Sequence, residues 1–182
     1  MLWVILAVLV VVLFGAIAMY NGLVSSRQQV NNAWAQVDVQ LKRRYDLIPN
    51  LVETVKGYMA HEKDTLERVI QARNMALQAK TVGEKATAEA AVGSALTGIF
   101  GLAEAYPDLK SNANMLALQE ELKGTEDKIA FARQYYNDTA TGYNTRIETF
   151  PSSIFANACG FTPKELFMVE DPAQREPIAV KF

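Results

Sequence analysis

The side chain types that most often carry out chemistry in proteins are scarce in this chain of 182 residues. His61 is its one histidine and Cys159 its one cysteine, so neither has the second His or Cys that a metal site or an activated nucleophile needs. Adjacent carboxylates at 120–121 and 126–127 are typical of a solvated helix face, and an acidic acid–base site is a weaker alternative. We therefore expect no catalytic residue, no metal ligand, no cofactor and no small-molecule substrate.

Four charged residues stand on faces that are otherwise apolar, where a buried charge without a partner is strongly destabilising. Arg44 is seven residues after Val37 and four before Ile48, so it points with the apolar stripe. We predict that Glu104 or Glu121 reaches Arg44, and that this group either fixes the register of packed helices or forms a polar patch for a partner. Three more residues follow the same spacing: Glu104, four after Phe100; Glu121, three after Leu118; and Arg133, four after Ile129.

Helical periodicity positions these residues along the chain. Apolar side chains recur every three or four positions from Val30 to Met59, with an average near the ~3.6 residues of a helical turn. Leu23 lies seven residues before this stripe, so the first helix is expected to continue from the apolar N-terminal run, with a hinge at Asn21-Gly22 as an alternative. Pro49 removes one backbone donor and clashes with the carbonyl four residues earlier, so we expect a kink there.

Three further long helices are predicted at 61–79, 84–105 and 112–147, with a break at Tyr106-Pro107-Asp108. A short helix ending at Ala158 has Ser152 and Ser153 as candidate caps, and residues 178–182 alternate weakly, as in an extended segment. The predicted fold is all-α: a single N-terminal transmembrane helix followed by an antiparallel four-helix-type bundle with long helices. The predicted domains are an anchor at 1–22, the bundle at 23–150 and a C-terminal short helix with an extended tail at 151–182.

The residues from Leu2 to Tyr20 are apolar except for Gly15, and no charge precedes Arg27. Nineteen helical residues reach about 28 Å, which matches the hydrocarbon core of a bilayer. Trp3 and Tyr20 stand at opposite ends, as interfacial aromatics do, and Gly15 offers a small-residue contact point between helices. A cleaved signal peptide is the alternative, but the run is long for one and no Lys or Arg precedes it. We predict a retained membrane anchor.

Charge is unevenly distributed along the rest of the chain. Residues 27–80 hold nine Lys and Arg against six Asp and Glu, whereas residues 81–182 hold nine against fourteen. The basic half either meets anionic headgroups or, as we favour, attracts the acidic helices of the bundle. Basic residues follow the span and none precedes it, so the C-terminal domain is expected in the cytoplasm. The formal net charge of −2 argues against nucleic acid as a partner.

One long segment resembles a known family. Residues 37–58, which read VDVQLKRRYDLIPNLVETVKGY and are followed by His61-Glu62, resemble the LemA family of bacterial membrane proteins. The resemblance covers essentially the whole chain and resumes in further segments at 103–110, 118–122, 125–130, 132–137, 143–144, 150–152 and 180–182.

The resemblance implies one N-terminal span, a helical bundle and no established enzymatic activity. Its motif residues Arg43, Asp46, Pro49 and Asn50 bring no catalytic role with them. We expect a membrane-anchored, non-enzymatic scaffold that self-associates as a homo-oligomer in the bacterial inner (plasma) membrane, with the lipid bilayer as a partner. The alternative is an adaptor that presents a binding face to another membrane protein, such as a protease or a transport component. A hydrolase with an acidic site is the weaker alternative.

Overall fold

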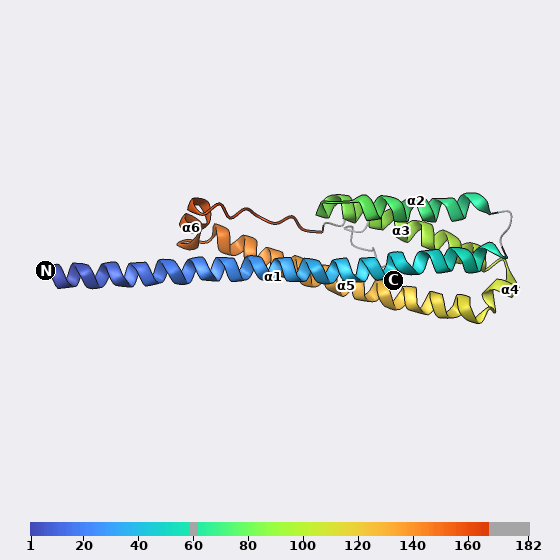
Figure 1. Cartoon of the computed structure of the whole chain (residues 1–182), viewed down its shortest axis with the longest axis horizontal. Helices are drawn as coiled ribbons and strands as arrows, with labels where there is room; N and C mark the ends of the chain where they lie inside the picture. Colours follow the sequence, from blue (N-terminus) through green and yellow to red (C-terminus); the bar gives the residue numbers. More distant parts are fainter. Residues whose placement is uncertain (59–61, 168–182) are drawn as a thin grey trace, which may run out of the picture. The chain divides into compact units, whose positions relative to one another are not determined.

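The computed structural model describes residues 1–58 and 62–167, and these residues form helices joined by short connections (Figure 1). The predicted all-α class is confirmed. Met59, His61 and the predicted extended tail at 178–182 lie outside the described residues. The helices of the described part are α1 (Leu2–Lys56), α2 (Lys63–Gln78), α3 (Val82–Ala103), α4 (Pro107–Lys110), α5 (Ala113–Glu148) and α6 (Ser152–Ala158).

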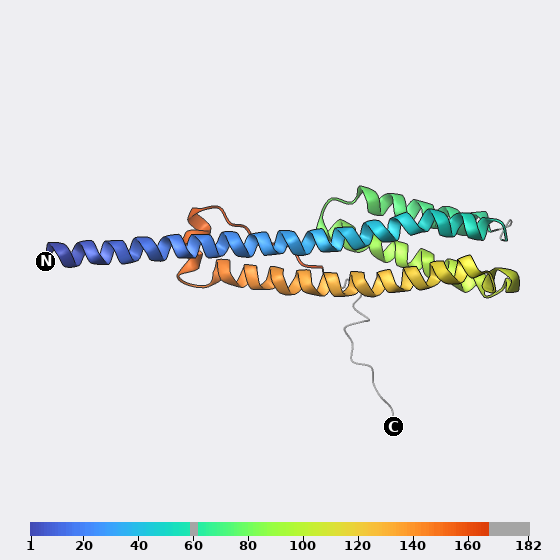
Figure 2. The same cartoon turned by 60° about the horizontal axis from the view of Figure 1, so that its bottom comes forward.

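Helix α1 runs without interruption for 55 residues and passes through both positions at which the sequence suggested a bend. Gly22 and Pro49 both lie inside it, and the ribbon is continuous in Figure 2. At 1.5 Å per residue the helix is about 83 Å long. The apolar N-terminal run and the first amphipathic stripe are therefore parts of one element.

The starts of α3 and α6 differ in how they are capped. At the start of α3 the Thr81 hydroxyl accepts a hydrogen bond from the Glu84 N–H (3.1 Å), and the Glu84 carboxylate accepts from the Thr81 N–H (3.2 Å), which is a capping box. The backbone N–H of Lys80, followed by that of Thr81, holds the pKa of Glu84 below its ordinary value. Pro151, and not Ser152, is the N-cap of α6, because the Ser152 hydroxyl donates back to the carbonyls of Arg146 and Thr149.

The described residues form two compact units, and α1 and α5 contribute to both. Unit 1 comprises 1–39 and 129–166; unit 2 comprises 40–128 and Phe167. The domain boundaries expected from the sequence stay a prediction.

In unit 2, segments of α1, α2, α3 and α5 enclose an apolar core. Leu41, Ile48 and Val55 of α1 are fully buried there, at positions that the helical stripe predicted. Leu51, which lies beside that stripe, and Ile99 of α3 are fully buried as well. Helices α2 and α3 pack along each other (Figures 1 and 2). The short α4 adds the buried Leu109, and the arrangement is compatible with the predicted four-helix-type bundle.

In unit 1, α1 is joined by the second part of α5 and by α6. The Trp34 and Tyr136 rings pack edge to face with their centroids 5.4 Å apart, and Tyr143 is fully buried. From Leu2 to Phe14, by contrast, every residue of α1 is exposed. By length and hydropathy α1 is a candidate membrane span, and none of its most apolar 18-residue stretch is buried.

By length and composition alone, α3 is a second helix of the described chain that could cross a bilayer. A third of its most apolar stretch is buried in unit 2, and Glu89 near its middle is buried against other helices of that unit. Its apolar character is therefore explained by packing within the unit.

Candidate functional site

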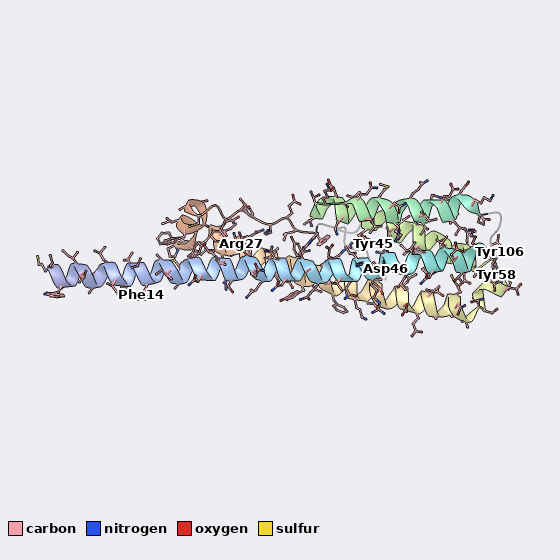
Figure 3. All side chains as sticks on the ribbon, in the orientation of Figure 1. Phe14, Arg27, Tyr45, Asp46, Tyr58 and Tyr106 are labelled. Carbon is pink, nitrogen blue, oxygen red and sulfur yellow. The ribbon has the colours of Figure 1, made fainter. Side chains whose placement is uncertain are left out.

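A buried ion pair in unit 2 joins α1 to α3. Arg44 is 3% exposed and Glu89 is 2% exposed, and the Arg44 Nη1 lies 2.9 Å from the Glu89 Oε2. The other Glu89 oxygen accepts a hydrogen bond from the Tyr45 hydroxyl, and Figure 3 shows Tyr45 on the C-terminal half of α1. Arg44 Nη1 also lies 3.1 Å from the half-exposed Glu126 carboxylate of α5. The group therefore ties three helices together through one guanidinium.

The predicted partners of Arg44 were wrong. Glu121 is exposed and pairs with the neighbouring Arg43 at 3.5 Å, and Glu104 is exposed and pairs with Lys110. Glu121 stands next to the buried Leu122, about 100° around the helix from the core-facing direction. Glu104 is the C-cap residue of α3. The helical spacing that predicted an inward direction for it therefore ends one residue earlier.

Glu89 is the partner that the sequence reading missed, although its spacing carried a signal. It lies three residues before Val92 and seven before Leu96, and both of those side chains are buried. Those intervals place it on the apolar face of α3 by the same argument that placed Arg44 on that of α1. Ala88, the preceding residue, is also buried.

The remaining residues singled out from the sequence lie in unit 1. Arg133 is half-buried on α5, and the Arg44 group contains no residue of that unit. Leu2, Trp3 and Tyr20 are exposed on α1, whereas Gly15 is half-buried. Tyr20 packs edge to face on Phe161, with ring centroids 5.9 Å apart.

The Arg44 group offers little for catalysis. Both oxygens of Glu89 are occupied by the Arg44 guanidinium and the Tyr45 hydroxyl, and Cys159 is exposed in the other unit. A cleft of about 460 Å³ reaches Arg44 between α3 and α5, and Glu126 and Asp127 line it. Within 1–58 and 62–167 there is no cluster of three His, Cys, Asp or Glu residues that could hold a metal ion. We call the group of Arg44, Tyr45, Glu89 and Glu126 a polar tie, because its contacts link α1, α3 and α5.

A second polar contact compensates for the proline inside α1. Pro49 has no N–H, so it cannot donate to the Tyr45 carbonyl, four residues earlier. The Nε of Arg73, on α2, donates to that carbonyl at 2.8 Å. The Tyr45 carbonyl, which Pro49 leaves without a backbone donor, thus links α1 to another helix of unit 2. Helix α1 continues through the proline.

In unit 1, side chains of α5 hold the backbone of the segment 162–165. Asn144 donates to the Lys164 carbonyl (2.9 Å) and accepts from the Lys164 N–H (2.8 Å). The Tyr136 hydroxyl donates to the Glu165 carbonyl (2.8 Å) and the Tyr143 hydroxyl to the Thr162 carbonyl (3.1 Å). The segment has no helix of its own, so these bonds satisfy backbone groups that would otherwise depend on water.

The two phenols make this attachment sensitive to alkaline pH. Burial raises the pKa of Tyr136, with a further contribution from the Glu165 charge, and burial also raises that of Tyr143. Their stabilising effect is complete below about pH 10, the ordinary tyrosine value, and is lost as the pH rises through the raised pKa values. A phenolate absorbance titration should therefore show late-titrating tyrosines that are missing from a Tyr136→Phe/Tyr143→Phe variant. Normalised curves that coincide would contradict this.

The fold and these contacts define an all-helical protein with a candidate N-terminal membrane span and a buried polar tie in its second unit. A model of the LemA family matches residues 33–182, and the chain belongs to that family. The chain is similar to "Protein LemA" of Metamycoplasma hominis, with 28% identity over 134 residues that cover 71% of the chain. It spans 60% of that relative's length.

Magnetosome proteins are also among the relatives. "Magnetosome protein MamQ 2" of Paramagnetospirillum magneticum is 27% identical over 202 aligned positions, which cover 96% of the chain and 74% of the relative. "Magnetosome protein MamQ" of Magnetospirillum gryphiswaldense is 25% identical over 185 positions, which cover 87% of the chain and 68% of the relative. The family resemblance on the sequence motifs is confirmed.

Proposed function

We propose that the chain is a non-enzymatic helical scaffold, anchored in the bacterial plasma membrane, that associates with further copies of itself. The observation that carries this is the continuity of α1, which includes both the apolar span and the Arg44 end of the ion pair. The apolar run and the arginine that contacts Glu89 and Glu126 are thus part of one uninterrupted helix, which favours a scaffold over an enzyme attached through a linker.

The use of the buried charges supports a role without catalysis. Catalytic carboxylates and cations stand where a substrate can reach them and are often only loosely satisfied. Here the Glu89 carboxylate is saturated by Arg44 and Tyr45. The magnetosome relatives, as proteins named for a membrane compartment, favour a membrane-organising role for this chain as well.

An exposed aromatic pair on α5 is where we place the contact with a second copy. Phe131 is 72% exposed and Tyr135, one helical turn later, is half-exposed. Copies anchored in one bilayer share an orientation, so they meet through the sides of their helices. Aromatic side chains are enriched in protein interfaces and are seldom left fully in water.

A mass measurement on the detergent-solubilised chain tests self-association. We expect a multiple of 20.1 kDa for the natural sequence. A Phe131→Ser/Tyr135→Ser variant should shift toward the monomer, by roughly tenfold or more in dissociation constant if the pair contributes about 1.4 kcal/mol or more. The control is Leu77→Ser, which removes an exposed apolar side chain from α2 and should leave the mass unchanged.

A monomer of the natural sequence would overturn the self-association proposal. The adaptor function would then be favoured, and crosslinking in intact membranes should capture a different membrane protein at the same surface. We also propose the cytoplasmic side for the C-terminal domain, and a C-terminal reporter assay tests that orientation directly: reporter activity restricted to the opposite side of the membrane would contradict it.

A further inference from the structure

The turn after α5 exposes two large apolar side chains. We call Phe150–Phe161, which includes α6, the elbow. Phe150 is 76% exposed and Ile154 is 58% exposed, although both belong to a part of unit 1 that is otherwise packed against α1. Apolar surface of this size is unfavourable in water unless something covers it.

The elbow is attached to α1 where the apolar span ends. Phe161 lies against Tyr20, and the Arg27 guanidinium carbon is 5.0 Å from the centroid of the same ring. Figure 3 shows Phe14 on the uncovered part of α1 and Arg27 beside the elbow. Arg146, near the end of α5, adds a hydrogen bond of 2.6 Å to the Ser26 hydroxyl of α1. The elbow and the adjoining end of α5 are thus held against α1 from Tyr20 to Arg27.

A helix ending places Phe161 against α1. Gly160 adopts a φ of +70°, a left-handed conformation that glycine takes without strain. The Phe161 N–H then bonds to the Ala156 carbonyl (2.9 Å) and the Gly160 N–H to the Asn157 carbonyl (3.4 Å), which is a Schellman motif at the end of α6. The chain reverses there, and the Phe161 ring is buried beside Tyr20.

The side chains of α1 become shielded from solvent only near the end of the apolar span. Leu2 to Phe14 are exposed, whereas Gly15, Ala16 and Met19 are half-buried and Leu23 is buried. A bilayer that covers the 19 apolar residues ending at Tyr20 has its headgroups at the level of Tyr20. The elbow is therefore attached to α1 where lipid headgroups begin, and Phe150 and Ile154 are its large exposed apolar side chains.

We propose that the elbow is a membrane-interface contact, in which Phe150 and Ile154 enter the headgroup region of the bilayer that α1 crosses. Apolar side chains of interfacial helices sit roughly 5–10 Å into this boundary. The cations Arg27 and Arg146, which contact Phe161 and Ser26, lie beyond Tyr20 on the same side of the span as the elbow, where anionic headgroups attract positive charge. This inference rests on the span of α1 and not on the scaffold function, and it gives the chain a second lipid contact that would fix the tilt and rotation of α1.

Fluorescence quenching in vesicles tests the proposal on the full chain. Phe150→Cys and Ile154→Cys, each combined with Cys159→Ser, carry an environment-sensitive fluorophore in phosphatidylethanolamine–phosphatidylglycerol vesicles. Replacing part of the lipid by chains brominated near the headgroup should reduce the emission at both positions by about twofold or more, as expected for side chains in this boundary. The variants should keep the far-UV circular dichroism of the Cys159→Ser chain.

Two label positions on α1 calibrate this experiment. Phe14→Cys lies on the exposed span and should be quenched, whereas Val39→Cys is exposed about 28 Å beyond Tyr20 along α1 and should not be. Quenching at Phe150→Cys and Ile154→Cys no greater than at Val39→Cys would overturn the proposal. So would an emission shift that depends on the protein-to-lipid ratio without bromine quenching, because it would show that a second copy covers the elbow.

A second measurement needs no substitution in the elbow. A lipid that carries a photoactivatable diazirine near its headgroup should give adducts within 150–154 of the natural chain. Adducts confined to the span would contradict the proposal.

Discussion

Arg44→Met is expected to lower the free energy of unfolding of the full chain in detergent by about 3–5 kcal/mol. The substitution leaves the Glu89 carboxylate, 2% exposed, without the guanidinium 2.9 Å away that compensates for its burial. Only the Tyr45 hydroxyl would still bond to it within the described group. Urea unfolding followed by circular dichroism measures the loss.

The neighbouring arginine provides a matched control. Arg43 is half-exposed, and its pair with Glu121 spans 3.5 Å at the surface. Surface pairs contribute about 0–1 kcal/mol, so Arg43→Met should change the unfolding free energy little. If Arg43→Met and Arg44→Met lowered the free energy of unfolding equally, the burial of Arg44 would not explain its contribution to stability.

A double variant separates a lost partner from a lost side chain. Arg44→Met/Glu89→Gln removes the buried charge but keeps an acceptor for Tyr45, and it should recover about 2 kcal/mol or more of what Arg44→Met loses. This experiment also distinguishes the two functions considered for inward Arg44. If Arg44→Met unfolded like the natural chain but gave a lower oligomer mass, the Arg44 group would be a patch for a partner. It would then not be a contact that fixes helix register.

The second large effect is expected at the proline of α1. Arg73→Met removes a charge-assisted hydrogen bond of 2.8 Å to the Tyr45 carbonyl and should cost about 1.5–3 kcal/mol. Pro49→Ala supplies a backbone N–H that can donate to the same carbonyl, and Ala is about 3 kcal/mol more favourable than Pro within a helix. Adding Pro49→Ala to Arg73→Met should therefore restore most of the loss.

The double-mutant cycle makes this prediction specific. In the natural background Pro49→Ala should gain less, because Arg73 already bonds to the carbonyl for which the new N–H would compete. Arg68→Met is the control: Arg68 also stands on α2, but its Nε bonds to the Asp64 carbonyl of its own helix at an exposed site. Additive effects of the Pro49 and Arg73 substitutions would show that the two residues do not share the Tyr45 carbonyl.

Much of the local structure was predictable, because its causes lie within a few residues of one another. The 3–4 spacing from Val30 placed the buried face of α1, and the Tyr106-Pro107 step ended the third long helix near Ala103. Boundaries were less certain. The Thr81–Glu84 capping box starts α3 two residues before the predicted beginning, and Pro151 replaces the predicted serine cap of α6.

The ion pairs could not be predicted to the same degree. Spacing gives the direction of a side chain around its own helix, and on this basis Arg44 was correctly placed on a buried face. It does not give the axial position of one helix against another, and this position decides which of several glutamates comes within reach. Glu89 and Glu126 meet Arg44, whereas Glu104 and Glu121 pair with other cations at the surface.

By itself, the sequence determined the all-α class, the uncharged candidate span and the inward placement of Arg44, since these follow from composition and from a periodicity of about 3.6 residues. Only the tertiary structure decided that Glu89 compensates Arg44, that Arg73 occupies the carbonyl freed by Pro49 and that Phe161 meets Tyr20. Each of these contacts joins residues on different elements far apart in the chain. Its existence depends on how helices are rotated and shifted against one another, which burial of the whole apolar surface selects and no local pattern specifies.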